Sequence, residues 1–138
     1  MTLPSLLVFA SAGVIFALGA IHLWYTFVGP KLRPRDPELE AKMKTVSPVL
    51  TSQTTMWRAW VGFNASHSFS ALLFGLIYGY LAIAQSQLLF SSIFLGLVGA
   101  FLLVGYIILG KLYWFSVPYR GILLASALYA SGFIATQI

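Results

Sequence analysis

The sequence predicts an all-α membrane protein: an up-and-down bundle of four transmembrane helices with a short amphipathic surface helix between the first two. Three observations lead to this fold class. The 138 residues are 59% hydrophobic and only 8% charged, whereas a soluble domain carries about a quarter charged residues. Four apolar stretches approach the length of about 20 residues that a helix needs to cross a bilayer. Most of the charge falls between the first two stretches.

The four apolar stretches define the expected spanning helices. They cover residues 3–28, 56–83, 88–110 and 121–138 of a single domain that occupies residues 1–138. The second and third connections are short, so consecutive helices are expected to run antiparallel. The chain has no cysteine, which excludes disulfides, thiolate metal sites and cysteine nucleophiles.

The long connection at residues 31–50 is expected to form the surface helix. Asp36 followed by Pro37 has the form of an N-cap with proline at the first helical position. Two Glu–Lys pairs follow at the four-residue spacing that supports a helix. Ser47 and Pro48 repeat the cap pattern, which predicts that the next helix begins as early as Val49.

The positions of lysine and arginine predict the orientation. All eight lie in or beside the first and third connections, and basic loops remain on the cytoplasmic side. The segment 31–50 is therefore expected in the cytoplasm and both termini on the outer, periplasmic side of an inner membrane. The net charge of +5 is interleaved with three carboxylates at one membrane face, so anionic lipid headgroups are the expected partner and nucleic acid is not.

A few polar side chains interrupt the apolar helices and form the candidate site. Polar groups in hydrocarbon are costly and face the interior of a bundle. On the second spanning helix, polar and aromatic residues recur every three or four positions between Trp57 and His67, so they share one face. His22 on the first helix can meet that face. The predicted ligand pocket contains His22, Trp57, Arg58, Trp60, Asn64 and His67.

Several roles for this cluster remain open at the level of sequence. It can bridge helices through hydrogen bonds, or form the polar end of a pocket for a lipid-like or quinone-like molecule. His22 and His67 could instead be the axial ligands of a b-type haem, or histidine could move protons in an isomerase-like enzyme.

The expected function is a non-enzymatic ligand-binding protein or an accessory subunit of a membrane complex, with a membrane-protein partner or a second copy of the chain. No catalytic motif appears within the apolar stretches, which favours a non-enzymatic role over the isomerase-like alternative. No metal site is expected either, because all three carboxylates lie in the surface connection. No cofactor is predicted apart from the haem alternative.

Two segments, HLWYTF at residues 22–27 and MWRAWVGFNASHS at residues 56–68, resemble those of a group of small bacterial four-helix integral membrane proteins with no assigned activity. The resemblance extends over nearly the whole chain and implies a bacterial inner membrane. It transfers no activity to any residue.

Overall fold

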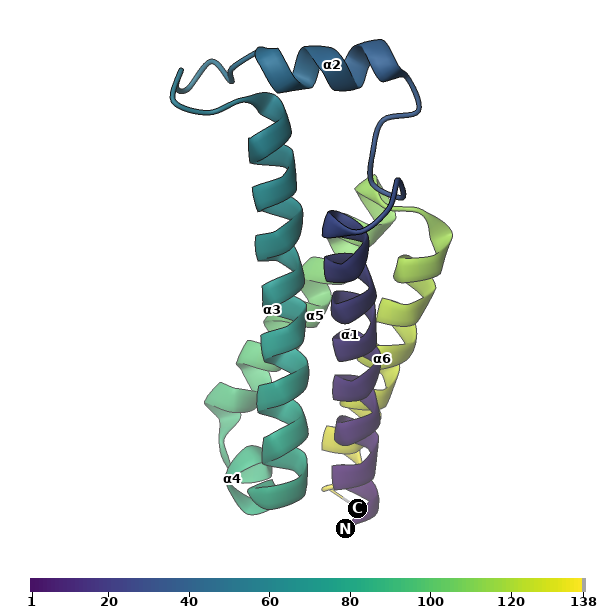
Figure 1. The fold of residues 1–138 in the computed structure, drawn as a ribbon. Coiled ribbons are helices and arrows are strands. Elements are labelled where there is room, and N and C mark those ends of the chain that lie inside the picture. Colours follow the sequence, from purple (N-terminus) through teal and green to yellow (C-terminus); the bar gives the residue numbers. More distant parts are fainter. Residues whose placement is uncertain (138) are drawn as a thin grey trace. The chain divides into compact units, whose positions relative to one another are not determined.

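The computed structural model describes residues 1–137, which form six helices and no strand (Figure 1). The helices are α1 (Leu3–Phe27), α2 (Pro37–Thr45), α3 (Met56–Ala84), α4 (Ser86–Ser91), α5 (Ile93–Tyr113) and α6 (Ser116–Ile134). Among them α1, α3, α5 and α6 are long and apolar enough to cross a membrane. The predicted all-helical class with four membrane-length helices is confirmed, and it indicates a multi-pass membrane protein.

The chain divides into two compact units. Unit 1 comprises Met1–Leu18 and Ala71–Ile138, and unit 2 comprises Gly19–Ser70. Helices α1 and α3 are each divided between the two units. The candidate site belongs to unit 2.

Small residues allow the helices of unit 1 to approach closely. A Cβ atom on Gly75 of α3 would overlap the side chain of Phe16 and lie 2.9 Å from the Ala12 carbonyl oxygen of α1. A Cβ atom on Gly132 of α6 would lie 3.1 Å from the carbonyl oxygen of Pro4. Both glycines are therefore required by close backbone contact, as small residues are at helix interfaces in membranes.

Gly13 and Ala17 on α1 have the four-residue spacing of small residues that favours close helix packing, but they form no such contact. A Cβ atom on Gly13 would meet nothing within 4 Å, and Ala17 is exposed. The reason is angular. Gly13 follows the buried residue Ala12 and so points about 100° away from it around the helix.

The third apolar stretch, expected as one helix from residue 88, is broken at Ser92. The short α4 ends before Ser92 and α5 begins after it. The Ser92 hydroxyl accepts a hydrogen bond from the Leu95 N–H at 3.3 Å, which is the geometry of an N-cap. The carbonyl of Leu95 in turn accepts a hydrogen bond of 2.7 Å from the Tyr78 hydroxyl of α3.

Two further boundaries differ from expectation. Helix α3 begins at Met56, the first residue of the expected span, and does not extend back to Val49, because the N–H of Thr51 bonds to the carbonyl of Pro48 at 3.2 Å and closes a turn. Helix α6 begins at Ser116, before the predicted residue 121. The predicted start followed Arg120, but this single charged residue lies within the first turns of α6 and does not interrupt the helix.

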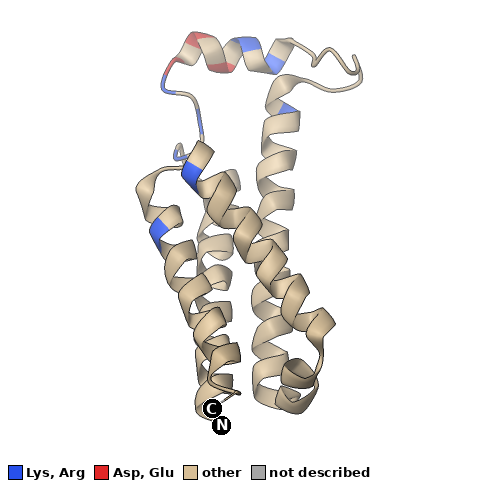
Figure 2. Cartoon of the chain, turned by 180° about the vertical axis from the view of Figure 1, so that it is seen from behind, with Lys and Arg blue, Asp and Glu red and all other residues tan. Residues whose placement is uncertain are grey.

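Unit 2 contains α2, which runs across the direction of α3 (Figure 1). Its predicted N-cap is confirmed, since Asp36 Oδ1 accepts a hydrogen bond from the Glu38 N–H at 2.8 Å. None of its residues is buried. The N–H of Met56 bonds to the carbonyl of Val46 at 2.8 Å, which ties the exit from α2 to the start of α3. In unit 2 the charged residues lie along α2, on the segment before it and at the start of α3 (Figure 2).

Candidate ligand pocket

The centre of the candidate site is a hydrogen-bonded pair between α1 and α3. Nε2 of His22 lies 3.0 Å from Oδ1 of Asn64, and Nδ2 of Asn64 lies 2.8 Å from the carbonyl oxygen of Trp60. Because a carbonyl can only accept, the amide nitrogen of Asn64 must face Trp60, and its oxygen must face His22. Nε2 of His22 therefore carries a hydrogen and donates a hydrogen bond to Oδ1 of Asn64. The expected contact between His22 and the polar face of α3 is confirmed.

His67 completes the cluster. Its ring lies edge-on to that of His22, with 5.4 Å between the ring centroids and 82° between the ring planes. Asn64 is only 8% exposed, and both histidines are half-buried. Ser68 lies on the same face of α3 and is fully buried. The sequence interpretation had not included it.

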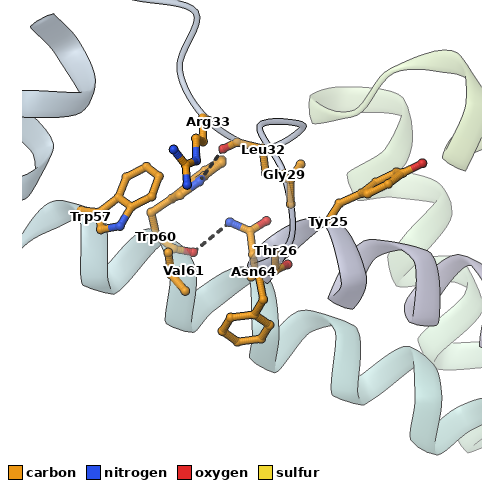
Figure 3. A pocket seen from close by; sticks show the side chains of 10 residues that line it. Tyr25, Thr26, Gly29, Leu32, Arg33, Trp57, Trp60, Val61 and Asn64 are labelled. Carbon is orange, nitrogen blue, oxygen red and sulfur yellow. Dashed lines mark hydrogen bonds between the residues drawn. The ribbon is translucent and has the colours of Figure 1, made fainter. Parts of the chain in front are cut away.

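A pocket of about 230 Å³ lies beside this cluster within unit 2 (Figure 3). Its walls come from the end of α1, the segment that follows α1, and the first turns of α3. The lining residues are Tyr25, Thr26, Phe27, Gly29, Leu32, Arg33, Trp57, Trp60, Val61 and Asn64. Three of these, Trp57, Trp60 and Asn64, were predicted for the pocket from the sequence.

The other predicted pocket residues occupy different positions. His22 reaches the pocket through its hydrogen bond to Asn64, and His67 contacts His22; neither lines the pocket. Arg58 does not line it either and is exposed. Arg58 directly follows Trp57, so its side chain leaves the helix about 100° away from the pocket-facing residue.

The lining residues that the sequence interpretation missed come mostly from α1 and the segment after it. Gly29 has a φ of +80°, a conformation that glycine adopts readily and that is common where helices end. The indole N–H of Trp60 then donates a hydrogen bond of 3.0 Å to the carbonyl of Leu32 (Figure 3). This bond holds the segment against α3. The Gly29–Pro30 turn was the available sequence signal for this change of direction.

A chain of charged contacts joins the pocket to α2. Nη1 of Arg33 lies 3.9 Å from Oε1 of Glu40, and Nζ of Lys44 lies 2.6 Å from the same oxygen. Lys44 also stands over the ring of Trp57, 5.4 Å from its centroid, a favourable cation–π arrangement. The hydrogen bond from Lys44 lowers the pKa of Glu40 below its ordinary value.

The lining of the pocket mixes aromatic, aliphatic and polar side chains. The polar share of this lining is at least as large as the apolar share, whereas most small-molecule pockets are predominantly apolar with a few polar groups. Among residues 1–137, no group of three or more His, Cys, Asp or Glu side chains is placed to hold a metal ion. A haem between His22 and His67 would require the two rings to separate from their edge-on contact, and His22 would need a ring nitrogen free to bind iron.

Comparison of the chain with models of known protein families, with curated proteins and with solved structures gives no match.

Proposed function

We propose that this is a non-enzymatic membrane protein that binds a lipid-like or quinone-like hydrophobic ligand in the unit 2 pocket. One observation supports this most strongly: an aromatic-walled cavity lies directly against the buried Asn64, whose amide is oriented by His22 and by the Trp60 carbonyl. Pockets for whole drug-sized ligands measure roughly 300 to 1,000 Å³. At about 230 Å³, this cavity suits a head group or a single ring, with the apolar tail outside it.

In the proposed arrangement the four long helices form an up-and-down bundle in a bacterial inner membrane, with both termini outside and α2 on the cytoplasmic surface. The basic residues before, within and after α2 support this orientation. The pocket would then lie at the headgroup level of the cytoplasmic leaflet. An amphiphile could enter from the bilayer with its head in the pocket and its tail among the acyl chains.

Tryptophan fluorescence tests this proposal. The chain has four tryptophans, and the double variant Trp24→Phe/Trp114→Phe leaves only Trp57 and Trp60, which line the pocket. This variant is placed in phosphatidylcholine nanodiscs and titrated with decylubiquinone or with a brominated short-chain phospholipid, both of which quench tryptophan. We expect saturable quenching by at least one probe.

Two matched variants make the result specific. Val61→Phe fills the pocket and should abolish saturable quenching. Ala59→Phe adds the same ring at an exposed position on the same helix, outside the lining, and should preserve it. Quenching that rises without saturation, equally in all three proteins, would show that the probes only partition into the bilayer and would contradict the proposal.

A b-type haem carrier is the second candidate, because the rings of His22 and His67 are adjacent. Absorption spectroscopy separates the two. The proposed function predicts a colourless protein that does not take up added haem. A Soret band corresponding to stoichiometric haem, lost in both His22→Ala and His67→Ala, would favour the carrier instead.

A further inference from the structure

We infer that the ligand of the unit 2 pocket is an anionic amphiphile whose phosphate or carboxylate head binds the guanidinium of Arg33. This inference rests on the proposed function and narrows it. It selects one chemical class, an anionic lipid-like molecule, over a neutral quinone-like one.

The charge of the lining favours an anionic ligand. Arg33 is the only charged side chain among the described residues that line the pocket, so no carboxylate there would repel an anion. Unit 2 as a whole carries six lysines and arginines against three acidic residues. A cleft with one sign of charge and low-dielectric walls attracts the opposite charge.

Several hydrogen-bond donors of the lining are already used within the protein. Asn64 uses both ends of its amide, on His22 and on the Trp60 carbonyl. The indole N–H of Trp60 is bonded to the Leu32 carbonyl, and the hydroxyl of Thr26 donates to the carbonyl of His22 at 2.8 Å. These lining groups already donate to protein oxygens. The Tyr25 hydroxyl and the Trp57 indole N–H also belong to the lining but are neutral donors, so Arg33 is the charged donor among the lining residues.

Arg33 has donors to offer. Its contact with Glu40 is 3.9 Å long, beyond hydrogen-bond distance, while Glu40 has a closer partner in Lys44 at 2.6 Å. The Arg33 side chain is 54% exposed. Guanidinium presents several N–H groups in a planar fork that matches phosphate and carboxylate oxygens, and such charge-assisted bonds are about twice as strong as neutral ones.

The same geometry gives Glu40 a defined role as a competitor. Glu40 and the bound anion would both attract Arg33, while Lys44 keeps Glu40 neutralised on its other side. Removing the charge with Glu40→Gln should therefore strengthen anion binding. If Glu40 only stabilised the fold, Glu40→Gln would not increase the affinity for the anion.

The test uses the Trp24→Phe/Trp114→Phe protein in phosphatidylcholine nanodiscs and three probes: decyl phosphate, decanol and inorganic phosphate. We expect decyl phosphate to change the emission of Trp57 and Trp60 saturably and with the highest affinity. Arg33→Gln should weaken this binding about tenfold or more, the loss expected for a charge-assisted hydrogen bond. Arg35→Gln is the matched control, because Arg35 lies on the same segment outside the lining, and it should bind nearly as well as the parent. Helix content and melting temperature of each variant establish that it is folded.

The other outcomes overturn separate parts of the account. Equal binding of decanol and decyl phosphate, unaffected by Arg33→Gln, would overturn the anionic head group and leave the pocket as a neutral-ligand site. Inorganic phosphate that competes as strongly as decyl phosphate would overturn the amphiphile and indicate a site for free anions. No saturable response to any of the three probes, together with none to the quinone and lipid probes above, would overturn the proposed function itself.

Discussion

Nε2–H of His22 donates to Oδ1 of Asn64 at 3.0 Å and thereby joins α1 to α3 within unit 2. A double-mutant cycle measures this bond. Asn64→Leu and His22→Leu should each destabilise the protein, because each leaves one polar group without its partner. The double variant should lose less free energy of unfolding than the sum of the two single losses, with a coupling energy of about 0.6 to 2 kcal/mol.

The measurement is the free energy of unfolding in mixed micelles. Ser66→Ala is the control, because its hydroxyl is exposed and bonds only to the Phe63 carbonyl of the same helix. Strictly additive losses at His22 and Asn64 would show that the contact contributes nothing.

Gly75 allows α1 and α3 to pack closely within unit 1. Gly75→Ala should destabilise the protein by about 1 to 3 kcal/mol, the usual cost of overpacking, because the added methyl group would overlap Phe16 and crowd the Ala12 carbonyl. Gly13→Ala, where the methyl group meets nothing within 4 Å, should be neutral or should stabilise by up to about 1 kcal/mol through helix propensity. Thermal denaturation of both variants makes the comparison, and equal melting temperatures would contradict it.

The charged contacts of α2 predict a pH dependence. The hydrogen bond from Lys44 lowers the pKa of Glu40 in the folded protein below its ordinary value of 4.5. A lowered folded-state pKa means that the contact stabilises the fold fully above 4.5 and that this stabilisation is lost as the pH falls through the folded pKa. Carbon-13 NMR of the Glu40 carboxyl measures that pKa directly.

Two lysine variants test whether Lys44 is what lowers the pKa of Glu40. Lys44→Met should move the midpoint of the Glu40 titration up toward its ordinary value. Lys42→Met removes a lysine from the same helix without touching the contact and should leave the midpoint in place. The same midpoint in Lys44→Met as in the parent would contradict the assigned cause.

The proposed orientation predicts the result of reporter fusions. A periplasm-dependent reporter joined after residue 138 should be active, and a cytoplasm-dependent reporter inserted in the segment 46–55 should also be active, because basic segments remain in the cytoplasm. Moving lysines from α2 to the chain start should weaken the preference. Activity of the opposite reporters at both positions would reverse the assignment.

The long helices could be predicted from the sequence because hydropathy is a local property. Helices α1 and α3 end within a residue of the expected limits. The break at Ser92 could not be predicted in the same way, because a single serine inside an apolar run becomes a cap only when the neighbouring carbonyls find partners such as Tyr78. Helix boundaries depend on such tertiary contacts.

Only the α3 side of the pocket could be predicted from the sequence. The three- or four-residue spacing on α3 identified Trp57, Trp60 and Asn64, because residues on one helix face recur with that period. Arg33 and Leu32 could not be assigned to it, because their position depends on the path of the chain after Gly29 and on the bond from Trp60 to the Leu32 carbonyl. Contacts between segments distant in the sequence leave no periodic signal.

Photo-crosslinking tests the central claim, that the pocket binds a lipid-like ligand, most directly. A decyl phosphate probe with a diazirine near its head is added to the protein in nanodiscs, and mass spectrometry locates the label. We predict saturable labelling of residues 25–33 and 57–64, lost in Val61→Phe and retained in Ala59→Phe. Labelling that never saturates, and that favours exposed positions of α5 such as Phe94 and Phe101, would contradict a ligand site in unit 2.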